Sequence, residues 1–102
     1  MKKQAVISVK DMEDNCDKVA GLMKAVAHPQ RLMILCHLST DEKTVGELED
    51  LCGASQSSVS QYLNRMRLEG LVSSEKRGLF VYYQIKDLKV KKLIIALHKI
   101  FC

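Results

Sequence analysis

The sequence predicts a mainly helical fold with one β-hairpin, because helical periodicity is interrupted by a single pair of β-rich runs. Apolar residues at helical spacing occur in four segments before these runs and in one segment after them. The chain has 102 residues, which suits one domain and leaves little room for a second. We therefore expect residues 1–102 to form a single domain.

The first two helices are predicted at residues 14–27 and 29–38, where apolar residues recur at helical spacing. Pro29 suits the first turn of the second helix, because the missing N–H of proline is not needed there. Residues 1–12 show no clear period, so we expect this segment to be partly disordered.

Two shorter helices follow, and each has a capping signal. Thr44 and Glu47 have the spacing of a capping box, which places the start of a helix at Thr44. Gly53 lies just past its end, where glycine adopts a left-handed conformation at little cost. Ser55 is a suitable N-cap for the next helix, which is expected at residues 56–69.

The hairpin and a closing helix complete the chain. Two β-rich runs, residues 71–76 and 79–85, flank Arg77 and Gly78, and residues 87–102 carry an apolar stripe at helical spacing. Two short helices followed by a hairpin form a winged helix-turn-helix. The predicted order is therefore four helices, the hairpin as a wing, and the closing helix.

The helix at residues 56–69 begins with serine and glutamine side chains that suit double-stranded DNA. Glutamine can pair with adenine through two hydrogen bonds, and free N–H groups at a helix N-terminus can bind phosphate. Each feature alone is also typical of a solvated surface. The net charge of +4 is compatible with a polyanionic partner but is weak evidence for one by itself. Their combination favours DNA. The predicted DNA-binding residues are Ser55, Gln56, Ser57, Ser58, Ser60, Gln61, Arg65, Arg67, Lys76 and Arg77.

Three motifs between Leu22 and Ile85 resemble those of one known family. Residues 25–32 match its signature before the second helix, residues 55–63 match its recognition helix, and residues 69–72 match the entry to its wing. The chain thus resembles the ArsR/SmtB family of bacterial transcription regulators. The resemblance implies a homodimer formed through the first and last helices, 14–27 and 87–102. It also implies a repressor that leaves its DNA operator when an inducer binds.

The usual metal sites of that family are incomplete in this sequence. The third-helix site needs a C-x-C pair near the helix start, whereas the one cysteine, Cys52, stands at the other end. The last-helix zinc site needs Asp-x-His and His-x-x-Glu, but Asp87 is followed by Lys89 and His98 by Phe101. We therefore expect neither a metal ion nor a cofactor.

Cys36 and Cys102 resemble the thiol pair of the persulfide-sensing branch of the family. In that branch the two thiols are joined within a subunit when reactive sulfur is present. The resemblance implies a redox-sensing Cys36/Cys102 dithiol, with reactive sulfur or an oxidant as the inducer. Judged from its apolar helical neighbours alone, Cys36 is more typical of a small core residue. Such neighbours should raise the pKa of the thiol, whereas the thiolate is the form that reacts. Cys16 and Cys52 fit no motif.

Other functions remain compatible with the sequence. One is a regulator that responds to another metal through ligands such as Cys16, His28 or His37, and another is a winged helix that binds protein instead of DNA. An enzyme is not expected, because the sequence has no phosphate-binding loop and no recognisable nucleophile–base pair.

The sequence also predicts a cytosolic compartment. The apolar run at residues 5–7 is too short for the core of a signal peptide. No stretch approaches the roughly 20 apolar residues that cross a bilayer, so no membrane partner is expected.

Overall fold

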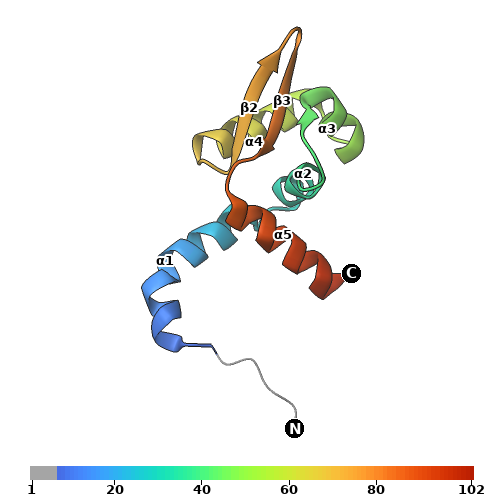
Figure 1. The fold of residues 1–102 in the computed structure, drawn as a ribbon. Helices are drawn as coiled ribbons and strands as arrows, with labels where there is room; N and C mark the ends of the chain where they lie inside the picture. The colour runs from blue at the N-terminus through green and yellow to red at the C-terminus, as the bar shows by residue number, and fades with distance from the viewer. Residues whose placement is uncertain (1–6) are drawn as a thin grey trace.

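The computed structural model describes residues 7–102 and has the predicted order of elements, with one added strand (Figure 1). The bounds are α1 Val9–Val26, α2 Pro29–Leu38, β1 Lys43–Thr44, α3 Val45–Cys52, α4 Gln56–Leu68, β2 Val72–Arg77, β3 Phe80–Ile85 and α5 Leu88–Phe101. Within residues 7–102, every helix is too short or too polar to traverse a lipid bilayer.

Helix α1 begins earlier than predicted, at Val9, so the expectation of disorder is wrong for residues 9–12. Residues 1–6, which the same expectation covered, lie outside the described residues. The hydroxyl of Ser8 accepts a hydrogen bond from the backbone N–H of Asp11 at 3.2 Å and caps the helix. The first turns of α1 expose almost every side chain. They have no buried face, so the sequence shows no apolar period there.

The two capping signals form as predicted. The backbone N–H of Glu47 donates to the Thr44 hydroxyl at 3.2 Å, and the backbone N–H of Thr44 donates to the Glu47 carboxylate at 3.0 Å. Gly53 ends α3 with a φ of 63°, a left-handed conformation that glycine adopts without strain. Ser55 accepts from the backbone N–H of Ser58 at 3.3 Å, which fixes the first turn of α4.

The hairpin pairs with a third strand, β1, which the sequence did not predict. The sheet order is β1-β3-β2, and Lys43 and Thr44 of β1 pair with Tyr83 and Tyr82 of β3. A strand of two residues is too short to show an alternating pattern. This pairing anchors the segment after α2 to the wing.

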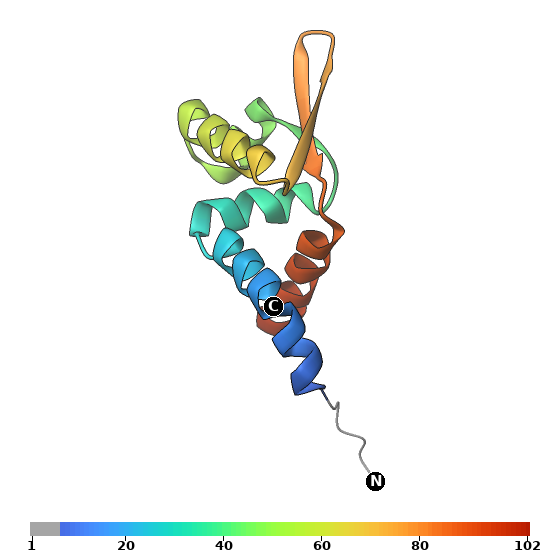
Figure 2. The ribbon, with the colours of Figure 1, turned by 90° about the vertical axis from the view of Figure 1, so that its left-hand side faces the viewer.

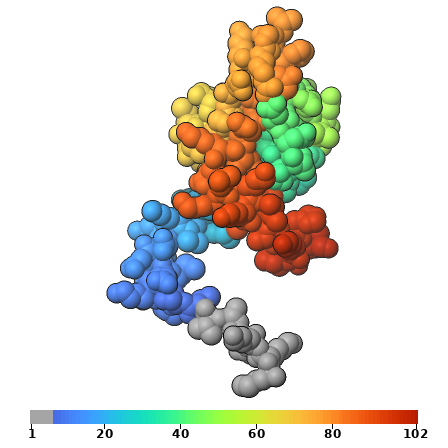
Figure 3. Space-filling view, in the orientation of Figure 1, coloured from blue at the N-terminus to red at the C-terminus, as the bar shows by residue number. Residues whose placement is uncertain are grey.

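The core lies between α2, α3, α4, the base of the hairpin and α5, whereas α1 contributes Val26 and the partly buried Leu22 and Ala25. The buried side chains are Val26, Ile34, Leu35, Leu38, Leu48, Val59, Leu63, Met66, Leu71, Val72, Val90 and Ile94. Figures 2 and 3 show the hairpin projecting from one end of the molecule and α1 and α5 extending at the other. The predicted DNA-facing elements and the predicted dimer helices are therefore at opposite ends.

Candidate DNA interface and paired-thiol site

The exposed side of α4 carries a row of polar side chains. Ser57, Gln61 and Asn64 follow one another at helical spacing, and all three are exposed. Gln61, Asn64 and Arg65 also line a shallow surface hollow of about 450 Å³. Asn64 was absent from the residues predicted to bind DNA, although its spacing from Gln61 would have placed it on the same face.

The predicted serines of α4 differ in how available their hydroxyls are. The hydroxyl of Ser55 caps the helix and also donates to the hydroxyl of Ser58 at 3.0 Å. Ser58 and Ser60 are half-buried, whereas Gln56 and Ser57 are exposed. The side chains best placed to meet a ligand at this helix end are therefore those of Gln56 and Ser57.

The predicted arginines of α4 lie near its C-terminal end and are exposed. Arg67 donates to the side-chain oxygen of Asn64 at 2.8 Å. Arg65 stands on the rim of the hollow beside Gln61. Both guanidinium groups are close enough to the polar row to extend it with positive charge, which suits a phosphate backbone.

The two predicted wing residues have different surroundings. Lys76 is exposed. Arg77 forms an ion pair with Glu42, has its Nε 3.8 Å from a Glu75 oxygen, and lies over the Tyr82 ring at 4.1 Å from its centroid. The hydrogen bond with Glu42 raises the pKa of Arg77 above its ordinary value.

Two contacts tie α2 to the recognition helix α4. Arg31 forms two hydrogen bonds with Glu69, at 2.8 and 3.4 Å, and its side chain is only 12% exposed. The Tyr62 hydroxyl lies 3.3 Å from Nε2 of His28, whose Nδ1 accepts from the backbone N–H of Gln30. The start of α2 is therefore in contact with the middle and the C-terminal end of α4.

The two thiols predicted to act together face one hollow. Cys36 on α2 and Cys102, just after α5, both line a hollow of about 230 Å³ whose walls are mainly apolar. Its remaining lining residues are Leu32, Ile94, Leu97, His98 and Phe101. Burial raises the pKa of the Cys36 thiol, and the nearby Cys102 raises it further. Cys36 is half-buried and Cys102 is exposed.

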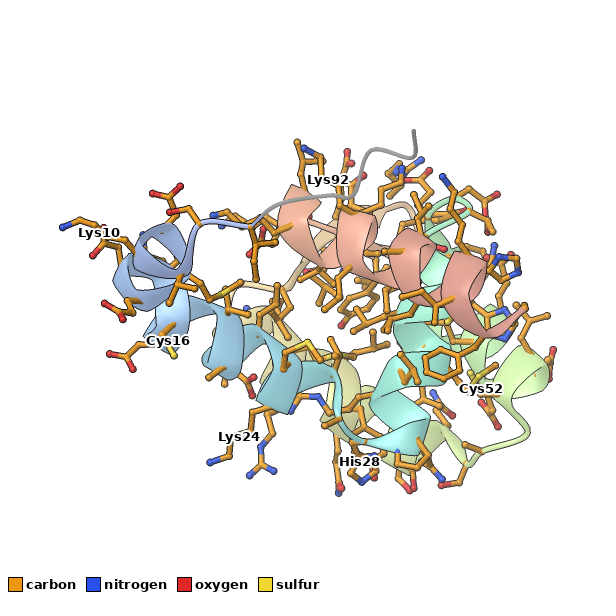
Figure 4. All side chains as sticks on the ribbon, turned by 90° about the horizontal axis from the view of Figure 1, so that it is seen from below. Lys10, Cys16, Lys24, His28, Cys52 and Lys92 are labelled. Atoms are coloured by element: carbon orange, nitrogen blue, oxygen red, sulfur yellow. The ribbon has the colours of Figure 1, made fainter. Side chains whose placement is uncertain are left out.

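The other two cysteines do not line this hollow. Figure 4 shows Cys16 and Cys52 at opposite sides of the view from below. Cys16 is exposed on α1, and Cys52 is half-buried at the end of α3, where burial raises its pKa. Among residues 7–102, no three histidine, cysteine, aspartate or glutamate side chains gather closely enough to hold a metal ion.

Comparison with known proteins identifies the family. Residues 28–74 match the model described as "Bacterial regulatory protein, arsR family". The chain is 40% identical over 100 residues to the transcriptional activator HlyU of Vibrio cholerae serotype O1, covering 98% of this chain and 93% of that protein. The chain belongs to the ArsR family. This ArsR-family member is a DNA-binding transcriptional regulator, and its similarity to regulators points to a non-enzyme.

Solved structures of ArsR-type regulators agree with this fold. The crystal structure of the transcriptional repressor BigR from Xylella fastidiosa has a TM-score of 0.89 and 38% identity, covering 94% of this chain and 98% of that one. A solution structure from Mycobacterium bovis, described as a homodimeric winged helix-turn-helix DNA-binding domain, has a TM-score of 0.73 and 28% identity. It covers 98% of this chain and 89% of that one. The predicted family and the winged helix-turn-helix fold are thus confirmed.

Proposed function

We propose that the chain is a homodimeric repressor in the cytoplasm that leaves its DNA operator when reactive sulfur joins Cys36 to Cys102. The observation that carries this proposal is the placement of both thiols on one hollow between α2 and the end of α5. Neither Cys16 nor Cys52 lines that hollow. A disulfide between these two thiols would therefore join α2 to the end of α5 and change their relative position.

The exposed row on α4 is the part we assign to base recognition. Gln56 and Gln61 have the amide groups that can form two hydrogen bonds with adenine in the major groove. Ser55, Ser57, Ser58 and Ser60 lie near the helix N-terminus, where backbone N–H groups favour a phosphate. Arg65, Arg67 and the wing residues then lie beside the DNA backbone.

A homodimer supplies a partner surface for the apolar side chains that α1 and α5 expose. In the protomer these side chains contact water, although burying them would stabilise the protein. They are Val9, Met12, Val19 and Met23 on α1, and Leu88, Ile95, Ile100 and Phe101 on α5. Pairing through these helices places two α4 helices in successive major grooves, about 34 Å apart.

The chemistry of the switch needs an organic persulfide and no further oxidant. The exposed Cys102 thiolate attacks the outer sulfur of the persulfide, and the organic thiolate leaves. The Cys36 thiolate then attacks the Cys102 sulfur, which forms the disulfide and expels hydrogen sulfide. Two electrons pass from the cysteine sulfurs to the transferred sulfur, so the products are the disulfide, one thiol and hydrogen sulfide.

The disulfide links α2 to α5, and α2 already contacts α4 through Arg31 and Glu69. The cross-linked protein therefore holds α4 in a different position relative to the dimer helices. A ligand or modification changes DNA affinity only when the two states bind DNA with different affinity. A coupling of about 1–3 kcal/mol is typical and corresponds to a roughly 5–150-fold change in DNA affinity.

The test compares cysteine variants on a duplex that the reduced protein selects from a randomised library. We expect a persulfide donor to weaken DNA binding by the wild type at least tenfold, and to have little effect on Cys36→Ser or Cys102→Ser. Cys16→Ser is the matched control and should respond as the wild type does. Release of DNA from both single variants by the donor would disprove the proposed switch, and no binding to any duplex at low salt would disprove the DNA-binding role.

A further inference from the structure

We propose that the ion pair between Glu42 and Arg77 couples the Cys36–Cys102 dithiol to the hairpin, and that Arg77 is a positioning residue. The inference rests on the proposed function, because it concerns how that switch reaches the wing. It changes the role of Arg77 from a DNA contact to a link between the wing and the end of α2.

The guanidinium of Arg77 already has protein partners on two sides. It donates to the Glu42 carboxylate and lies over the face of the Tyr82 ring, 4.1 Å from the centroid. An arginine held by a carboxylate and an aromatic ring has both its charge and its planar face occupied. The pairing with Glu42 partly neutralises the charge that Arg77 would otherwise offer to a phosphate. The neighbouring Lys76 is exposed, so it is the wing cation that we assign to the DNA backbone.

Glu42 stands in the short segment that joins α2 to β1. The start of this segment is fastened to the last turn of α2, because Ser39 donates to the backbone carbonyl of Cys36 at 2.6 Å. Thr40 similarly donates to the carbonyl of His37 at 2.8 Å. Movement of the Cys36 backbone towards α5 therefore displaces the segment that carries Glu42.

The sheet gives this segment a fixed position against the wing. Directly after Glu42, Lys43 pairs with Tyr83 of β3. Arg77 belongs to β2, on the far side of β3 from β1, so its side chain spans the sheet to reach Glu42. The ion pair is thus a side-chain link between the outer strand of the wing and the segment that follows Cys36.

The size of the effect is limited by solvent. The side chains of Arg77 and Glu42 are 43% and 39% exposed, and exposed ion pairs change equilibrium constants by up to about five-fold. The measured quantity is therefore the ratio of the DNA dissociation constants of the cross-linked and reduced proteins. This ratio cancels any general gain in DNA affinity that follows from removing a negative charge.

The experiment uses the Cys16→Ser/Cys52→Ser protein, in which Cys36 and Cys102 are the only thiols. Diamide, a diazene oxidant, takes up two hydrogens and becomes a hydrazine as the disulfide forms. We expect Glu42→Gln to lower the dissociation-constant ratio by about two- to five-fold. Glu75→Gln is the matched control, since Glu75 is also near Arg77 but belongs to the hairpin and has no connection to α2.

A charge-swapped protein, Glu42→Arg with Arg77→Glu, separates coupling from a simple loss of structure. It keeps the ion pair with reversed ends and should restore the ratio towards that of the parent. If Glu42→Gln and Glu75→Gln have the same ratio, the inference is wrong while the proposed function stands. If the parent itself shows a ratio of one with the cross-link confirmed by mass, the proposed function falls and takes the inference with it.

Discussion

Cys36 shows how a half-buried thiol differs from an exposed one. Its surroundings favour the neutral thiol, because burial excludes water and Cys102 adds a second group of the same charge type. A neutral thiol is a poor nucleophile. Cys36 is therefore better suited to close the disulfide, at short range, than to capture the persulfide from solution.

We predict that alkylation of Cys36 by iodoacetamide continues to accelerate as pH rises past 9.0, the ordinary pKa of a thiol. Cys102→Ser should lower the pKa of Cys36 but leave it raised, because burial is the larger cause. Because the pKa of Cys36 is higher in the folded protein than in the unfolded chain, the unfolded chain ionises first. The contribution of Cys36 to the free energy of unfolding is therefore fully present below pH 9.0 and is lost as pH rises through the folded-state pKa. Mass spectrometry of the Cys36 peptide over a pH series measures the rate. A rate that levels off below pH 9.0 would contradict the assigned environment.

At the scale of elements, features set by residues close in sequence were easier to predict than features that depend on tertiary contacts. The bounds of α3 and the start of α4 followed from caps, because the Thr44–Glu47 and Ser55 bonds lie within a few residues. By contrast, β1 depends on a partner strand far along the chain, and the Glu42–Arg77 pair joins two distant segments. The apolar stripe of the last helix is likewise divided by tertiary contacts, because Ile94 is buried in the core whereas Phe101 is 79% exposed.

The candidate DNA interface and the thiol pair were likewise predicted from the residues only where a local pattern shows them. The exposed row on α4 follows from helical spacing, which is a local property. The shared hollow of Cys36 and Cys102 came from a family resemblance, because spacing alone does not show that α2 and the end of α5 are neighbours. The engagement of Arg77 was missed because sequence does not reveal which exposed cations are paired.

The capping box of α3 yields a stability prediction. Thr44→Ala removes the hydroxyl that accepts from Glu47 N–H, and we expect it to lower the free energy of unfolding by about 1 kcal/mol. Glu47→Gln keeps a side-chain oxygen for the Thr44 N–H and should cost much less. Urea denaturation with circular dichroism measures both. Equal losses in the two variants would mean that the hydroxyl bond contributes little.

The wing yields a prediction about salt. Lys76→Ala should weaken DNA binding and reduce the slope of log affinity against log salt by about 0.9 for each wing, because one phosphate contact is lost. Lys92→Ala removes the same charge from an exposed position on α5, outside the hairpin, and should leave the slope unchanged (Figure 4). Fluorescence anisotropy at several salt concentrations measures the slope. An unchanged slope in Lys76→Ala would place that side chain away from the DNA.

At the scale of the molecule, the distribution of exposed apolar side chains is uneven. Helices α1 and α5 extend at the end opposite the hairpin, and both expose large apolar residues there. The row that we propose to face DNA lies on α4, nearer the hairpin (Figure 2). A second protomer can therefore cover α1 and α5 without obstructing α4.

We predict that Met23→Glu separates the dimer, because it places a charge on the α1 surface, where Met23 is 45% exposed. Leu79→Glu makes the same kind of change at the tip of the hairpin, at a side chain that is 94% exposed, and should remain dimeric. Sedimentation velocity over a concentration series distinguishes the two. Identical sedimentation of both variants as dimers would exclude α1 from the interface.

The sparse anchoring of α1 has a consequence for how the protein behaves on dilution. Val26 is the fully buried residue of this 18-residue helix, and Leu22 and Ala25 pack only partly against the core. Most of the stability of a helix in a protein comes from packing of its apolar face. In the proposed dimer the partner supplies the missing packing, so folding of this segment and association of the two copies become coupled. Lowering the protein concentration should unwind α1 before the core melts, so the cellular copy number itself sets how many intact regulators exist.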